Sequence, residues 1–146
     1  MIGIRNVFKT LADVVFTSNT TLATIGLTSP IAKNEEQVFS AWVAFTLGAT
    51  GGAKCEVVVP AGGSKYAVSI TYFDSLTPAV DVAVQTSAAA FGKALANAGN
   101  YYAKIEGYVK NGSTAGNIDI QFAQNSSDAN SLTILQGSWM EVIKLN

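Results

Sequence analysis

Apolar and polar residues alternate with a period of two along most of this chain, which predicts β-strands. The clearest example covers residues 37–47, where Phe39, Val43 and Phe45 fall on one face. Trp42 and its neighbours make the opposite face apolar too, so this strand is expected to be covered on both sides.

The same pattern predicts six further strands. They cover residues 53–59, 65–73, 79–86, 101–110, 117–124 and 132–145, the last kinked or divided at Gly137. The alanine-rich stretch 87–99 fits either one or two helical turns or a loop with a short strand, and its β-rich surroundings favour the second. Between residues 110 and 117, Asn-Gly followed by Ala-Gly predicts a hairpin with positive φ at Gly112 and Gly116.

Seven to nine short strands separated by Gly, Pro, Asn and Ser are typical of an all-β fold with an antiparallel β-sandwich. At 146 residues the natural version is a single domain with a jelly roll of about eight strands. No repeat of fixed period is visible, which disfavours a solenoid or a propeller.

Composition adds that the chain has apolar surface to hide. Apolar residues make up 49% and charged residues only 13%, with a mean hydropathy of +0.28. No apolar run reaches the roughly 20 residues of a membrane helix, so we expect contacts between subunits to bury this surface and no membrane partner. The net charge of −1 and the absence of a basic stripe argue against a nucleic-acid partner.

The sequence shows no set of residues typical of a catalytic site or a metal site. There is no histidine and one cysteine, Cys55, in an apolar strand, which excludes histidine triads and cysteine-based metal sites. Glu106 and Asp119 face outward on strands expected to be neighbours, so a paired-carboxylate glycosidase is conceivable, although solvation is the preferred role for both. A loop without metal is likewise preferred around Asp128. We expect no enzyme and no cofactor.

Aromatic residues on the predicted strands allow two interpretations. They can form a platform on which sugars stack, or they can serve the core and subunit contacts, which we favour. The residues in question are Trp42, Trp139, Tyr66, Tyr72, Tyr101, Tyr102 and Tyr108. For a subunit interface the candidates are Phe39, Trp42, Phe45 and Trp139.

The C-terminal half, from residue 104 to residue 145, resembles a module that recurs in tailed-bacteriophage structural proteins. Its signature is Asn-Gly with a following Ala-Gly, then Ala-Gln-Asn, then a Leu-x-Gly-Ser-aromatic closing strand. The matching residues of hairpin and loop include Asn111, Gly112, Gly116, Gln124 and Asn125. The resemblance extends over residues 17–146 and is weakest at 74–100.

This resemblance implies a jelly-roll domain similar to tumour-necrosis-factor-like heads, assembled as a homotrimer. Its implied function is that of a non-enzymatic capsid decoration (cement) protein on the outer surface of the virion, bridging subunits of the phage major capsid protein. The alternative is a head-fibre or receptor-binding tip that recognises a glycan of the host surface. Only about twenty residues and no shaft precede the module, which favours decoration.

Residues 1–16 are expected to form either an N-terminal arm or the first strand of the sandwich. They carry no apolar stretch and cleavage site of the kind that marks a signal peptide. As an arm, the segment would dock on the shell or on a neighbouring copy and become ordered there. The apolar residues available for that contact are Ile2, Ile4, Val7, Phe8 and Leu11.

Overall fold

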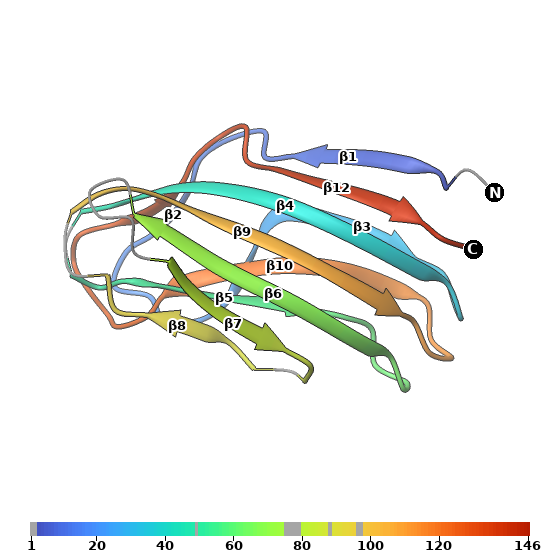
Figure 1. Ribbon diagram of the computed structural model, residues 1–146. Coiled ribbons are helices and arrows are strands. Elements are labelled where there is room, and N and C mark those ends of the chain that lie inside the picture. Colours follow the sequence, from blue (N-terminus) through green and yellow to red (C-terminus); the bar gives the residue numbers. More distant parts are fainter. Residues whose placement is uncertain (1–2, 49, 75–79, 88, 96–97) are drawn as a thin grey trace.

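The protein is an all-β sandwich of two antiparallel sheets (Figure 1). A computed structural model describes residues 3–48, 50–74, 80–87, 89–95 and 98–146, with the backbone alone for residues 80 and 81. Within these ranges no helix is long and apolar enough to cross a membrane.

Twelve strands are assigned in the described residues. In chain order they are β1 (Arg5–Lys9), β2 (Val14–Phe16), β3 (Ala23–Ile31), β4 (Glu36–Leu47), β5 (Ala53–Val58), β6 (Lys65–Asp74), β7 (Val80–Gln85), β8 (Phe91–Lys93), β9 (Gly99–Lys110), β10 (Gly116–Gln124), β11 (Leu132–Ile134) and β12 (Trp139–Lys144).

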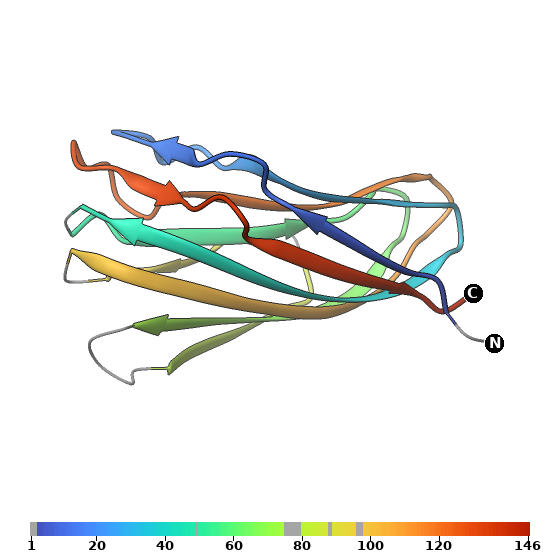
Figure 2. The ribbon, with the colours of Figure 1, turned by 90° about the horizontal axis from the view of Figure 1, so that it is seen from above.

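The strands divide into a large and a small sheet. The large sheet has the order β1-β12-β4-β9-β6-β7, and β11 extends it by pairing with β4 and β2. The small sheet has the order β3-β10-β5-β8. Figure 2 shows the two layers from above, with β1 and β12 side by side at one edge.

This order is that of a jelly roll. Along the chain, β3, β4 and β5 alternate between the sheets, and β8, β9 and β10 alternate again. The β6–β7 hairpin is inserted between these two series and widens the large sheet. The strand number exceeds the expected seven to nine because both ends of the chain form divided strands, β1 with β2 and β11 with β12, and because β3 and the short β8 add to the predicted strands.

The core lies between the two sheets and explains why the alternation is so regular. Along β4, residues at odd positions from 37 to 47 are buried and those at even positions are partly exposed. Phe45 lies at the centre of the interior with no exposed surface, and its ring contacts Tyr101 and Tyr72 of its own sheet. It also contacts Phe122 of the small sheet, with ring centroids 6.0 Å apart. Cys55 is buried as expected.

The predicted hairpin between residues 101–110 and 117–124 is wrong. β9 pairs with β4 and β6 in the large sheet, whereas β10 pairs with β3 and β5 in the small one. The five-residue connection over residues 111–115 therefore crosses between layers, and neither Gly112 nor Gly116 has positive φ. Gly112 is required for a different reason: a Cβ there would lie 2.0 Å from the carbonyl oxygen of Gly62.

The region after Pro78 follows the favoured interpretation. Residues 80–85 form β7 beside β6, and the alanine-rich stretch contains the short strand β8 rather than a helix. Gly137, with φ of 86°, lies in the turn that separates β11 from β12, which confirms the predicted break.

Candidate functional site

A row of aromatic side chains crosses the outer face of the large sheet. Trp139 of β12 is the direct partner of Trp42 of β4, and Tyr102 of β9 is the direct partner of Phe73 of β6. Directly paired residues point to the same face, and Trp42 and Tyr102 are diagonal neighbours on adjacent strands. We call these four residues the aromatic row.

Three rings of the aromatic row, those of Trp42, Tyr102 and Phe73, stack on one another across the strands. Tyr102 is stacked against Phe73 with centroids 4.5 Å apart and against Trp42 with centroids 5.2 Å apart. These separations match the roughly 4.8 Å spacing between strands, so the rings stand up from the sheet. Both faces of Tyr102 are covered by neighbouring rings, and it has no free face on which a sugar could stack.

A groove borders the aromatic row where the large sheet meets the turn between β11 and β12. It encloses about 390 Å³. Its lining is mainly apolar and consists of Trp42, Ala44, Tyr102, Leu135, Gln136, Gly137, Ser138 and Trp139. We call it the Trp42 groove.

The groove exists because the strand facing β4 is divided. β11 pairs with β4 at residues 45–47 and β12 pairs with it at residues 37–42, so the turn between them leaves Val43 and Ala44 without a strand partner on this side of β4. Ser138 Oγ accepts a hydrogen bond from the Ala44 amide at 3.0 Å, and Leu135 N donates to the Ala44 carbonyl at 2.9 Å. The positive φ of Gly137 allows the turn.

Thr10 holds the turn in place from the other side. It is 3% exposed, its amide donates to the Ser138 carbonyl at 2.8 Å, and its hydroxyl donates to the Leu135 carbonyl at 3.0 Å. Gly137 N donates in return to the Thr10 carbonyl at 3.1 Å. The Leu-x-Gly-Ser-aromatic stretch at residues 135–139 is thus the wall of the groove, fixed by the connection between β1 and β2.

Several charges on this outer face form ion pairs within the chain. Arg5 Nη2 donates to Glu141 at 2.7 Å, and Lys104 Nζ lies 3.0 Å from Glu106. Lys104 Nζ also lies 5.8 Å from the Trp42 ring centroid, over its face. Because opposite charges are interspersed, the face presents no strong field of one sign.

Of the four candidates for a subunit interface, two lie on the outer face of the large sheet and two lie in the core. Trp42 and Trp139 lie together on the outer face, as the interpretation requires. Phe39 and Phe45 are 4% and 0% exposed and fill the interior, so assigning them to a subunit interface is wrong. The strand alternates strictly, and side chains of opposite parity cannot share one surface.

The other candidate aromatics are scattered as well. Tyr72 and Tyr101 are buried in the core, and Tyr66 packs against it. Burial raises the pKa of the Tyr72 hydroxyl well above its ordinary value, and this hydroxyl donates to the Phe91 carbonyl at 2.9 Å. Tyr108 is on the outer face, where its hydroxyl donates to Glu36 at 3.0 Å. A platform of all seven rings does not form.

The described residues of the N-terminal segment lie mostly in the large sheet. β1 pairs with β12 along its length. Ile4, Val7 and Leu11 are 65%, 65% and 79% exposed, whereas Phe8 packs against the core and is not free for a partner. Ile2 lies outside the described residues. The contact of this segment with a capsid stays a prediction.

Two polar residues of the resemblance signature are buried and organise loops. Asn111 Nδ2 donates to the carbonyls of Ala32 and Thr114 at 2.8 and 2.9 Å, and its Oδ1 accepts from Ser64 Oγ at 2.8 Å. Gln124 Nε2 donates to the carbonyls of Asp128 and Asn130 at 3.0 and 2.7 Å. These side chains replace backbone pairing that the turns lack.

The remaining signature residues serve the same loops. Asn125 donates its amide to the Gly52 carbonyl at 3.4 Å, and the Cβ of a residue at Gly116 would press on Pro60 at 3.0 Å. The signature therefore shapes the two ends of the sandwich, and its polar members are structural.

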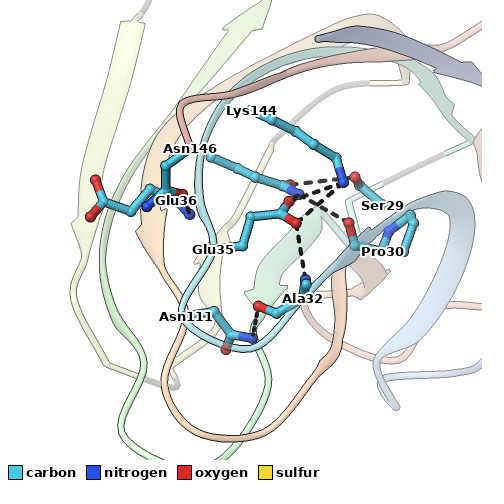
Figure 3. A network of polar contacts seen from close by, with 9 residues as sticks. Ser29, Pro30, Ala32, Glu35, Glu36, Asn111, Lys144 and Asn146 are labelled. Carbon is cyan, nitrogen blue, oxygen red and sulfur yellow. Dashed lines mark hydrogen bonds and ion pairs between the residues drawn. The ribbon is translucent and has the colours of Figure 1, made fainter. Parts of the chain in front are cut away.

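A second polar cluster ties the last strand to the turn before β4 (Figure 3). Glu35 accepts hydrogen bonds from Gln37 Nε2 and from the Ala32 amide, and Lys144 Nζ lies 3.2 Å from it. Gln37 is fully buried and also donates to the Pro30 carbonyl at 3.0 Å. Burial raises the pKa of Glu35, but the hydrogen bonds from Gln37, Lys144 and Ala32 outweigh it and lower this pKa overall.

The alternative in which Glu106 and Asp119 form a catalytic pair does not hold, because the two carboxylates do not meet. Glu106 lies on the outer face of the large sheet and Asp119 on the outer face of the small one, so the sandwich separates them. Asp119 Oδ1 instead accepts from Thr24 and Thr28 at 2.6 and 2.7 Å. No three acidic, cysteine or histidine residues gather into a possible metal site within the described ranges.

Sequence reasoning missed Phe73, Leu135 and Gln136 as members of the outer site. Phe73 was recognised only as the end of a strand, and its contact with Tyr102 depends on the pairing of β6 with β9. Residues 135–136 fall in a strand break whose neighbours, Ala44 and Thr10, are distant in sequence. No local signal shows such neighbours.

Comparison with known proteins gives little further information. No family model matches the chain, and no curated protein does. Among solved structures, it is similar to a chain in the structure of infectious bursal disease virus Gx strain (7% identity, TM-score 0.28) and to infectious bursal disease virus VP2 in a subviral particle (9% identity, TM-score 0.23). The alignments cover 97% of this chain and 40% of the viral chains, so the chain spans about two fifths of their length. At these TM-scores the similarity does not bear on fold or function, and the fold rests on the strand order above.

Proposed function

We propose that this chain is a non-enzymatic structural protein of a phage virion that forms a homotrimer and decorates the outer surface of the capsid. The observation that supports it most directly is the aromatic row on the outer face of the large sheet. The rings of Trp42, Tyr102 and Phe73 are preorganised by stacking on each other, and aromatic residues are enriched in protein interfaces. The resemblance to phage structural modules supplies the virion context.

The dimensions of the face suit a subunit contact. Six strands about 4.8 Å apart and about nine residues along each strand cover roughly 700 Å². A standard protein interface buries about 800 Å² on each partner. A contact of this size on each copy would also bury apolar surface of the kind that the high apolar content of the chain leads us to expect.

Association is tested by sedimentation equilibrium of the wild type and a Trp42→Glu variant. The variant removes a large apolar ring from the centre of the proposed interface and puts a carboxylate there, opposite Lys104 on β9. We expect it to sediment as a monomer while the wild type sediments as a trimer, because burying this charge costs free energy. Val58→Glu is the matched control, because Val58 is exposed on the outer face of the small sheet. A monomeric wild type at all concentrations would contradict the proposal.

Decoration requires a separate experiment. Protein that binds only the assembled shell stabilises that shell by mass action, so particles assembled without it should release DNA at a lower temperature. Exposed Ile4, which directly precedes β1, and exposed Val7 within β1 are the proposed contacts with the major capsid protein. Identical release temperatures with and without the protein would rule out the cementing role while leaving the trimer intact.

A further inference from the structure

Asn111 and Gly112 form the only Asn-Gly pair in the sequence. Such a pair is chemically reactive, because the backbone nitrogen that follows an asparagine can attack its side-chain carbonyl carbon. Glycine makes this attack easiest, since it has no side chain to hinder the approach and its backbone adopts many conformations. The pair lies in the connection between β9 and β10, at the point where the chain crosses from one sheet to the other.

The folded chain holds the two reacting groups in an arrangement that prevents the attack. Gly112 N donates to Asn111 Oδ1 at 3.0 Å, so the amide hydrogen, and not the electrons of the nitrogen, is directed at the side-chain carbonyl. The peptide groups on both sides are also fixed, because the Asn111 amide donates to the Glu35 carbonyl at 2.9 Å and the Asn34 amide donates to the Gly112 carbonyl at 2.9 Å. With Asn111 only 3% exposed, water has little access to it.

The nitrogen that this reaction would remove is the one on which the fold depends. Asn111 Nδ2 donates to the carbonyls of Ala32 and Thr114 at 2.8 and 2.9 Å, and Figure 3 shows the first of these bonds. A carboxylate has no hydrogen to donate, so an aspartate here would face two carbonyl oxygens without a bond to either. Buried acceptors that lose their donor cost free energy. The loss would fall on the turn before β4 and on the crossing itself.

We propose that Asn111 is a self-modification site that is unreactive in the folded chain and deamidates once this end of the sandwich opens. The Gly112 nitrogen loses its proton to hydroxide and forms a bond with Cγ of Asn111. The bond between Cγ and Nδ2 breaks, and the nitrogen takes up a proton from water and leaves as ammonia. Another water molecule opens the cyclic imide at either carbonyl and gives aspartate or isoaspartate. The net reaction consumes one water, releases one ammonia and involves no oxidation or reduction.

Deamidation at this site makes unfolding irreversible. Aspartate lacks the two donated hydrogen bonds, and isoaspartate also adds a carbon to the main chain beside Gly112. There is no room for that carbon, since even a Cβ at Gly112 would lie 2.0 Å from the Gly62 carbonyl oxygen. A chain that reacts while it is open therefore no longer refolds to the same structure. The inference goes beyond the proposed function and does not depend on it.

The first test compares the rate of deamidation with and without urea in the same mildly alkaline buffer. Mass spectrometry of digested wild-type protein measures the loss of the amide at Asn111. We expect this loss to be roughly tenfold faster or more in urea, because the reaction follows the open fraction of the chain. Asn117 is the internal control: it is exposed, but the bulky Ile118 hinders ring closure, so it should keep its amide under both conditions. Equal rates at Asn111 with and without urea would overturn the inference, as would an intact Asn111 in urea.

The second test asks whether the modified chain refolds. Wild-type protein is held in urea for increasing times and then diluted, and near-ultraviolet circular dichroism measures the folded fraction. We expect this fraction to fall in step with deamidation of Asn111, and the recovered folded protein to contain intact Asn111. Complete refolding of deamidated chains would contradict the inference.

A pair of variants separates the loss of the amide from the effects of long incubation in urea. Asn111→Asp should have a lower urea midpoint than the wild type, whereas Asn117→Asp, on the exposed side of β10, should stay close to it. If Asn111→Asp does not fold at all, the result agrees with the inference, and the refolding of aged wild-type protein remains the quantitative test. Equal stability of the two variants would show that the fold does not need the Asn111 amide.

Discussion

Gln85 shows how a single side chain joins the two sheets. It lies on β7 of the large sheet and is 5% exposed. Its Nε2 donates to the Val57 carbonyl at 3.0 Å, and its Oε1 accepts from the Val57 amide at 3.2 Å. β8 pairs with β5 only at residues 53–55, so this amide takes the place of a missing strand partner for Val57.

Replacing Gln85 by Met should therefore destabilise the fold although the volume is kept. Both backbone groups of Val57 would be buried without partners, and we expect a loss of roughly 1–3 kcal/mol in the free energy of unfolding, measured with urea. Gln121→Met on the outer face of β10 is the control and should change the stability by less than about 0.5 kcal/mol. Equal effects of the two variants would show that Gln85 acts through packing alone.

Glu35 makes the stability of the sandwich dependent on pH. Its pKa is lowered in the folded state, so its contribution is complete above the ordinary glutamate pKa of about 4.3 and is lost as the pH falls through the lowered value. Glu35→Gln should be less stable than the wild type at pH 7, and the difference should shrink at pH 3. Urea unfolding across this range measures it.

The matched variant for this experiment is Glu106→Gln. Glu106 is half exposed and paired with Lys104 on an open surface, where an ion pair contributes little. A stability difference for Glu35→Gln that is the same at pH 7 and pH 3 would contradict the role of the carboxylate.

At the scale of elements, the break between β11 and β12 depends on one backbone conformation. Gly137 has φ of 86°, and a Cβ there would meet nothing within 4 Å. The cost of a side chain is therefore conformational, about 1–2 kcal/mol for Ala and less for Asn, which tolerates left-handed φ. Thermal unfolding of the two variants should show Gly137→Asn as the more stable.

Gly112 should give the opposite order. Its φ is not positive, but a Cβ would clash with the backbone of Gly62 at 2.0 Å. The larger Asn side chain should then be worse than Ala. If Asn were more stable than Ala at both positions, or less stable at both, then either the backbone explanation for Gly137 or the steric explanation for Gly112 would be wrong.

The elements also show how far the sequence pattern reaches. Strand positions and inward faces were predictable because burial between two sheets imposes a period of two, as along β10. The pairing of β9 and β10 was mispredicted because a short glycine turn suits a hairpin and a crossing between layers alike. Phe39 and Trp42 were both assigned to one interface because both faces of this strand are apolar. The alternation along β4 nevertheless puts the two side chains on opposite faces of the sheet.

For the whole molecule, self-association predicts a thermal midpoint that depends on concentration. Only the folded chain forms the interface, so each tenfold rise in protein concentration adds about 1.4 kcal/mol for one contact. We expect the midpoint to rise by roughly 3–6 °C, and scanning calorimetry at two concentrations measures it. The thermal midpoint of Trp42→Glu should not depend on protein concentration. A wild-type midpoint that is also independent of concentration would argue against assembly.

The sequence alone determined the fold class, the inward faces of most strands, the buried thiol and the surplus of apolar residues. All of these follow from local alternation and composition, which water imposes directly on the chain. Only the tertiary structure decided the division into two sheets, the stacking of Phe73 on Tyr102 and the Trp42 groove. Those features depend on which strands pair. Pairing brings together residues that are distant in the sequence, and no local pattern predicts that they become neighbours.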